Sequence, residues 1–149
     1  MKKKKSSGKN DNLFISKSLL MSDPFKKLPK AAINLYFAFL MKRQMQAVGK
    51  PGHEKWVIKN NGDIVFTYSM GFDELGMYSP SFRRAIDHLV NYGFIDINYH
   101  GSGGVKGDCS KYAISNRWRQ YGSEQFDQKP RPKDLRPIGY RRNNKANPK

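Results

Sequence analysis

The chain has 149 residues and a formal net charge of +16, from 28 lysine and arginine residues against 12 aspartate and glutamate residues. This length suits one domain with one hydrophobic core, and no apolar run approaches the roughly 20 residues that span a bilayer. The single cysteine, Cys109, excludes an intramolecular disulfide framework. We expect a soluble, cytoplasmic protein, because the N-terminal lysines lack the apolar run of a secretory signal and low cysteine usage is typical of a reducing compartment.

Both ends of the chain are basic and lack an apolar pattern. Residues 1–12 carry five lysines against one aspartate, and residues 117–149 carry ten basic residues against three acidic ones. The prolines near the C-terminus resist regular structure, so we expect disordered basic tails at residues 1–12 and 122–149 around one domain at residues 13–121. Such tails favour non-specific contact with phosphate backbones, although solubility alone also explains the lysine cluster.

The first long helix is predicted at Pro29–Met45, where apolar residues recur along one side and extend into a wide arc. Its aromatic residues are interpreted as core packing. The run Gly49–Gly52 ends this helix, and two short strands then follow, at Trp56–Ile58 and Ile64–Tyr68, on either side of a turn at Asn60–Asp63.

A short helix is predicted next, at Ser69–Gly76, with Phe72 and Leu75 facing inward. A second helix follows, with Ser79 as N-cap, Pro80 at the first helical position and Gly93 at the closing left-handed position. Its apolar stripe comprises Phe82, Ala85, Ile86, Leu89 and Val90. Its opposite face carries Ser81, Arg83, Arg84, Asp87, His88 and Asn91.

A hairpin is predicted after the second helix, with strands at Ile95–Tyr99 and Lys111–Ile114. The glycine-rich connection between them is not a phosphate-binding loop, because Lys106 precedes glycine rather than serine or threonine and the run leads into a strand. We interpret the connection as the tip of a wing. A short closing helix is expected at Asn116–Gly122, with Trp118, Tyr121 and Phe126 packed on the core.

These elements predict an α+β fold, a winged helix-turn-helix with three core helices, a small antiparallel sheet and a wing hairpin. Such a domain usually binds duplex DNA. The charged face of its second helix is, however, also typical of an ordinary surface helix. The candidate base-reading residues are Ser79, Ser81, Arg83, Arg84, Asp87 and His88. An alternative role for Asp87 is to orient an arginine, so no base is assigned to it. The candidate backbone or wing contacts are Tyr78, Lys106, Lys111, Arg117 and Arg119.

Four segments, Lys17–Leu28, Ala31–Tyr36, Asn61–Tyr68 and Ser79–Leu89, resemble the N-terminal domain of RepA-type plasmid replication initiators. The resemblance covers about residues 13 to 115. It implies a winged-helix fold, binding to repeated duplex sites and often dimerisation, in replication initiation or transcriptional regulation of a plasmid or other mobile element. A homodimer and replication or transcription proteins are thus candidate partners beside double-stranded DNA, whereas no membrane partner is expected.

Three other classes of protein remain open. A basic RNA-binding protein would share the charge but display exposed aromatic residues, whereas the aromatics here are assigned to core positions. An interaction adaptor, for example in helicase loading, would keep the fold without DNA affinity. An enzyme is the least favoured class, because His53, His88 and His100 lack metal-ligand spacing and Asp73-Glu74 is an isolated acidic pair. We expect no metal and no cofactor.

Overall fold

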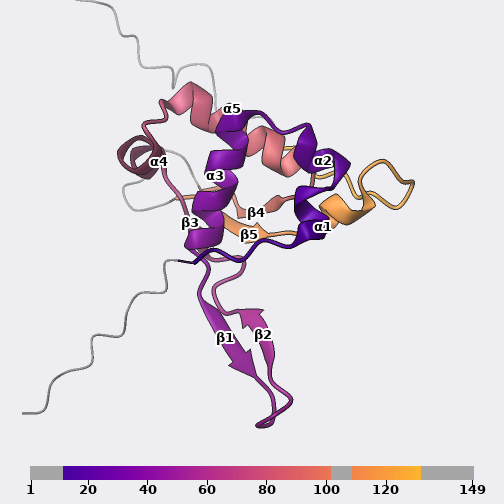
Figure 1. Ribbon diagram of the computed structural model, residues 1–149. Helices are drawn as coiled ribbons and strands as arrows, with labels where there is room; N and C mark the ends of the chain where they lie inside the picture. Colours follow the sequence, from indigo (N-terminus) through magenta and orange to yellow (C-terminus); the bar gives the residue numbers. More distant parts are fainter. Residues whose placement is uncertain (1–11, 102–108, 132–149) are drawn as a thin grey trace, which may run out of the picture.

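The computed structural model describes residues 12–101 and 109–131, and it confirms the predicted α+β class (Figure 1). The helices are α1 (Lys17–Leu20), α2 (Asp23–Lys26), α3 (Lys30–Met41), α4 (Tyr68–Leu75), α5 (Ser79–Asn91) and the short 3₁₀ helix η1 (Arg117–Gln120). The strands are β1 (Met45–Val48), β2 (Lys55–Ile58), β3 (Ile64–Val65), β4 (Ile95–Tyr99) and β5 (Lys111–Ile114).

The core lies between the helices and an antiparallel sheet with strand order β3-β5-β4. The central strand β5 pairs with both neighbours at Tyr112, which faces Ile64 in β3 and Ile97 in β4. From α3, the ring of Phe39 lies 5.1 Å from the rings of both Phe66 and Tyr112. One continuous core therefore joins α3, α5 and the three-stranded sheet, as a chain of this length requires.

Helix α5 follows its predicted pattern closely. All five residues of its apolar stripe, Phe82, Ala85, Ile86, Leu89 and Val90, are buried. The chain leaves the helix through Gly93, which has a φ of 83° in the left-handed region. The predicted N-cap is displaced by one residue, because Tyr78 occupies the capping position without a side-chain hydrogen bond, and Ser79 is the first helical residue.

The helix predicted at Pro29–Met45 is too long, and its last residues form a hairpin that was missed. β1 pairs with β2 in register from Met45 opposite Ile58 to Val48 opposite Lys55. The side chain of Asn60 explains why α3 stops: its amide donates to the carbonyl of Lys42 at 3.0 Å, and its oxygen accepts from the N–H of Gln44 at 2.8 Å. The strand predicted at Trp56–Ile58 therefore pairs with β1, whereas β3, in the strand predicted at Ile64–Tyr68, pairs with β5.

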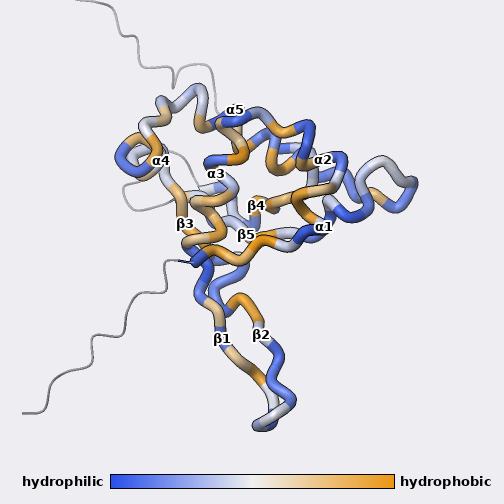
Figure 2. Tube along the Cα trace, in the orientation of Figure 1, coloured by the Kyte–Doolittle hydropathy of each residue, from blue (hydrophilic) through white to orange (hydrophobic). Residues whose placement is uncertain are grey.

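The β1–β2 hairpin projects away from the rest of the chain (Figure 1). Residues directly opposite each other share a face of a two-stranded sheet, so one face of the hairpin carries Met45, Ala47, Trp56 and Ile58. All residues of β1 are exposed, and Trp56 is 69% exposed. Figure 2 shows hydrophobic stretches in both β1 and β2, next to hydrophilic ones.

The segment between β3 and α4 differs from the prediction in two respects. The strand predicted at Ile64–Tyr68 ends at Val65, because the hydroxyl of Thr67 accepts from the N–H of Met70 at 3.2 Å and starts α4. The inward orientation predicted for Phe72 is wrong, since its side chain is 51% exposed. Gly71 faces the core instead, where a Cβ atom would lie 2.4 Å from the ring of Phe82.

Within residues 12–101 and 109–131, no helix has the length and apolar character needed to cross a membrane.

We expect the free energy of unfolding to fall at high pH because of Tyr36. Burial raises the pKa of its hydroxyl from 10.0 to about 12, although the charge of Arg43 acts in the opposite direction. The unfolded chain therefore ionises first, so the contribution of neutral Tyr36 is complete below pH 10 and is lost as the pH rises from 10 to 12. A shift of this size corresponds to about 2–3 kcal/mol.

Urea unfolding of the wild type and of Tyr36→Phe between pH 8 and pH 11.5 measures this contribution. The Tyr36→Phe variant should lose less stability over this interval, because phenylalanine has no proton to release. Tyr112, which is also buried, has a pKa raised by burial and acts equally in both proteins. Parallel curves for the two proteins would show that Tyr36 does not contribute.

Candidate nucleic-acid interface

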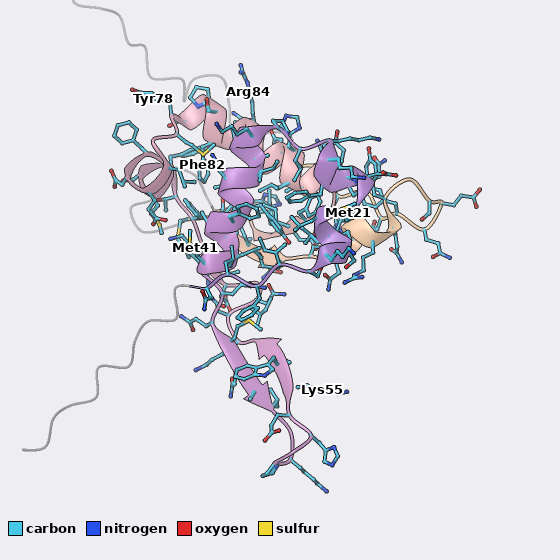
Figure 3. The ribbon with its side chains drawn as sticks, in the orientation of Figure 1. Met21, Met41, Lys55, Tyr78, Phe82 and Arg84 are labelled. Carbon is cyan, nitrogen blue, oxygen red and sulfur yellow. The ribbon has the colours of Figure 1, made fainter. Side chains whose placement is uncertain are left out.

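The N-terminal half of α5 presents serine and arginine side chains to solvent. Ser79, Ser81, Arg83 and Arg84 are exposed, and in Figure 3 Arg84 points away from the body of the protein while Phe82 points into it. The first turn of a helix also carries the positive end of its dipole and unpaired backbone N–H groups. Four predicted base-reading residues therefore lie together at an exposed, positively charged end of the helix.

The other two predicted base-reading residues lie further along α5 and are half-buried. The carboxylate of Asp87 accepts a hydrogen bond from Nε of Arg131 at 2.7 Å. The ring of His88 stacks on the ring of Tyr92, with the centroids 6.4 Å apart and the planes 10° apart. Asp87 and His88 therefore both contact other residues of the protein. Their side chains are less accessible to a ligand than those of Arg83 and Arg84.

Two aromatic residues flank the exposed end of α5. Tyr78 is 70% exposed and its ring lies 5.4 Å from that of Phe72, which is itself exposed. Figure 3 shows Tyr78 at the outer corner where α5 begins. The assignment of the aromatic residues to core positions is therefore wrong for Phe72 and for the hairpin residue Trp56. Tyr78 was predicted as a backbone or wing contact and is exposed.

The predicted wing residue Lys111 is exposed on β5, where its ammonium group lies 3.3 Å from a carboxylate oxygen of Asp63. At this exposure the ion pair contributes little to stability, and the lysine remains accessible to a phosphate group. Lys106 lies outside the described residues.

Arg119 lies beyond the opposite end of α5. Its guanidinium group is 4.6 Å from the centre of the Trp118 ring, and the N–H of Trp118 donates to the carbonyl of Gly93, just after the helix ends. Arg119 is exposed, but the structure does not bring it to the end of α5 that carries Arg83 and Arg84.

The side chain of Arg117 forms its contacts within the protein. Its side chain is 10% exposed and forms an ion pair with Asp96. Its remaining donors bond the carbonyls of Val90 and Asp127 at 2.9 and 2.7 Å, with a longer bond of 3.3 Å to the carbonyl of Ile95. The carbonyls in the last turn of a helix have no hydrogen-bond partner within the helix. Because the Val90 carbonyl belongs to the last turn of α5, Arg117 supplies a donor for one of these groups. We therefore leave it out of the proposed nucleic-acid contacts.

Sequence reasoning missed Arg131, because it assigned residues 122–149 to a tail. Residues 122–131 instead return to the domain, where the rings of Tyr92 and Tyr121 lie 5.1 Å apart and those of Tyr121 and Phe126 lie 5.4 Å apart. Tyr121 and Phe126 were expected to pack on the core, and they do mark this return, but nothing in the sequence linked Arg131 to Asp87.

Cys109 is a half-buried free thiol. Among residues 12–101 and 109–131, no three His, Cys, Asp or Glu side chains are grouped so as to hold a metal ion. Comparisons of the chain with protein-family models, with curated proteins and with solved structures found no match.

Proposed function

We propose that this protein binds double-stranded DNA in a sequence-specific manner through a winged helix-turn-helix, in replication initiation or transcriptional regulation of a plasmid or other mobile element. The order α3, β3, α4, α5, β4, β5 supports this fold. In this proposal α4 and α5 form the helix-turn-helix, and the β4–β5 hairpin is the wing. The biological setting rests on the resemblance to RepA-type initiators alone.

The exposed pair Arg83 and Arg84 at the N-terminal half of α5 carries the proposal. A recognition helix reads base edges in the major groove with its N-terminal residues. An arginine there can hold the O6 and N7 atoms of guanine in a bidentate pair, while Ser79 and Ser81 and the helix N-terminus suit phosphate contacts. The net charge of +16 favours encounter with DNA.

The exposed rings of Phe72 and Tyr78 favour a second candidate, binding to single-stranded nucleic acid or RNA. Unpaired bases stack on exposed aromatic side chains, whereas bases within a duplex are not available for stacking. The two candidates therefore differ in which nucleic acid binds most tightly at equal charge and length.

The proposal is tested by comparing affinities for duplex DNA, single-stranded DNA and structured RNA of matched length at two salt concentrations. We expect the tightest salt-resistant binding for a particular duplex, located by footprinting on the DNA that flanks the gene. Equal affinity for all duplex sequences would contradict sequence-specific recognition. A preference for RNA or for single strands would establish the second candidate instead.

We expect Arg84→Ala to weaken binding to the footprinted duplex by roughly 10- to 100-fold, the loss of one bidentate base contact. Binding to a random duplex should fall only a few-fold, because only charge is lost there. Lys55→Ala is the matched control, since it removes one exposed charge from the hairpin, far from α5 (Figure 3). Equal losses on both duplexes would exclude Arg84 from base reading, and fluorescence anisotropy measures them.

A further inference from the structure

The C-terminal segment Tyr121–Arg131 lies along the second half of α5. After the aromatic contact between Tyr121 and Tyr92, residues Gln128, Lys129 and Pro130 border a small hollow together with Asn91 and Tyr92. The segment then reaches Asp87, one helical turn earlier, through Arg131. It thus runs from the end of α5 back toward the exposed arginines.

The ion pair between Arg131 and Asp87 has a short, well-aligned geometry on a partly exposed surface. Nε of Arg131 lies 2.7 Å from a carboxylate oxygen of Asp87, and the two side chains are 25% and 39% exposed. Ion pairs at such exposure contribute little to stability because water screens them and both side chains lose rotamer freedom. The main consequence of this ion pair is therefore that it holds the guanidinium group of Arg131 at a fixed place beside α5.

The pair also changes the charge of the proposed interface. Asp87 is the only acidic residue in α5, and an unpaired carboxylate beside Arg83 and Arg84 would repel phosphate groups. Arg131 neutralises that carboxylate. The Nε bond uses one of the five donors of the guanidinium group, so Arg131 can contact a phosphate while it is bound to Asp87.

We infer that Arg131 is a further DNA-contacting residue, and that Asp87 is the positioning residue that holds it beside the recognition helix. This inference rests on the proposed function. It assigns to Asp87 a role other than base reading and to Arg131 a contact with the phosphate backbone next to the groove that α5 enters. Residues 132–149, which follow directly in sequence, carry six basic residues against one acidic residue.

The role of Asp87 has an unusual experimental signature. Simple electrostatics predicts that Asp87→Asn, which removes a negative charge, strengthens binding to DNA. If Asp87 positions Arg131, the same substitution weakens binding because the guanidinium group is no longer held. The two mechanisms therefore predict effects of opposite sign.

The experiment uses the full chain and measures the affinities of Asp87→Asn, Arg131→Gln and the double variant for the footprinted duplex and a random duplex of equal length. We expect Arg131→Gln to weaken both by roughly 3- to 10-fold and to lower the slope of log affinity against log salt by about one, as for a lost phosphate contact. Asp87→Asn should weaken both by a smaller factor, and the double variant should match Arg131→Gln. All variants should melt within a few degrees of the wild type.

Each other outcome overturns the inference. Stronger binding by Asp87→Asn together with weaker binding by Arg131→Gln would show two independent charges. Stronger binding by both variants would show that the C-terminal segment blocks α5. Duplex binding by the wild type that neither variant changes would overturn this inference and leave the proposed function intact, whereas a wild type that does not bind duplex DNA would remove both.

Discussion

Replacing Arg117 with leucine is expected to lower the free energy of unfolding by about 2–4 kcal/mol, because the guanidinium group, 10% exposed, pairs with the partly exposed Asp96 and also bonds backbone carbonyls. The substitution leaves the carboxylate of Asp96 without its cation and removes the donors that bond the carbonyls of Val90 and Asp127. Three parts of the chain meet at this one guanidinium group: the end of α5, the start of β4 and the C-terminal segment. Urea unfolding followed by circular dichroism measures the loss.

Arg117→Lys is the informative control, because it keeps the charge without the planar fork of donors. It should recover part of the stability by pairing with Asp96, but it cannot reach all the carbonyls at once. The sequence-based assignment of Arg117 to DNA contact makes the opposite prediction. If Arg117→Leu retained wild-type stability and lost DNA affinity, Arg117 would be a phosphate contact and not a structural residue.

Gly93→Ala is expected to cost about 3–5 kcal/mol, from the strain of a left-handed alanine and from overpacking. The φ of Gly93 is 83°, and a Cβ atom there would lie 2.6 Å from the backbone nitrogen of Trp118 and 2.8 Å from the carbonyl carbon of Arg117. Backbone atoms cannot move aside as the end of a side chain can. The substitution should therefore displace η1 from the core, and the fluorescence of Trp118 should report its exposure.

Gly76→Ala separates these two contributions. Gly76 also has a left-handed φ, at 65°, but apart from its two chain neighbours no residue has an atom within 4 Å of the position where its Cβ would be. We expect a loss of about 1–2 kcal/mol for Gly76→Ala, from conformational strain alone. Equal losses in the two variants would show that the contact between Gly93 and η1 is not tight.

Helix α5 could be predicted from sequence because its signals are local. Pro80 near its start, Gly93 after its end and the spacing of the buried stripe all lie within fifteen consecutive residues. The hairpin β4–β5 was predictable for the same reason, since alternation over a few residues is enough to indicate a half-buried strand. In each case the residues that determine the element are the residues of the element itself.

The end of α3 could not be predicted in this way. Met41 to Met45 include good helix-forming residues, and the contact that ends the helix comes from Asn60, 16 residues beyond Gln44. The turn residues at Gly49–Gly52 indicated only that the helix had ended before them. Neither local propensity nor periodicity contains information about a side chain so far along the chain.

The same difference between local and long-range contacts applies to the candidate site. Arg83 and Arg84 were predicted as exposed because their helical phase opposes the buried stripe. The pairing of Asp87 with Arg131 spans 44 residues, and the composition of the C-terminal segment indicated only a solvated tail. Arg117 was predicted as a backbone contact because a basic residue near a surface strand has the same sequence signature whether it contacts phosphate or bonds the carbonyl groups at the end of a helix.

The projecting hairpin implies that this domain has two units of cooperativity. Its strands pair with each other, all residues of β1 are exposed and only Ile58 of β2 is half-buried. Asn60 bonds the backbone of Lys42 and Gln44 where the hairpin leaves the body. A two-stranded hairpin without such packing is marginally stable. It can therefore open and close many times during the lifetime of one folded core, and selection can alter its sequence without changing the stability of the core.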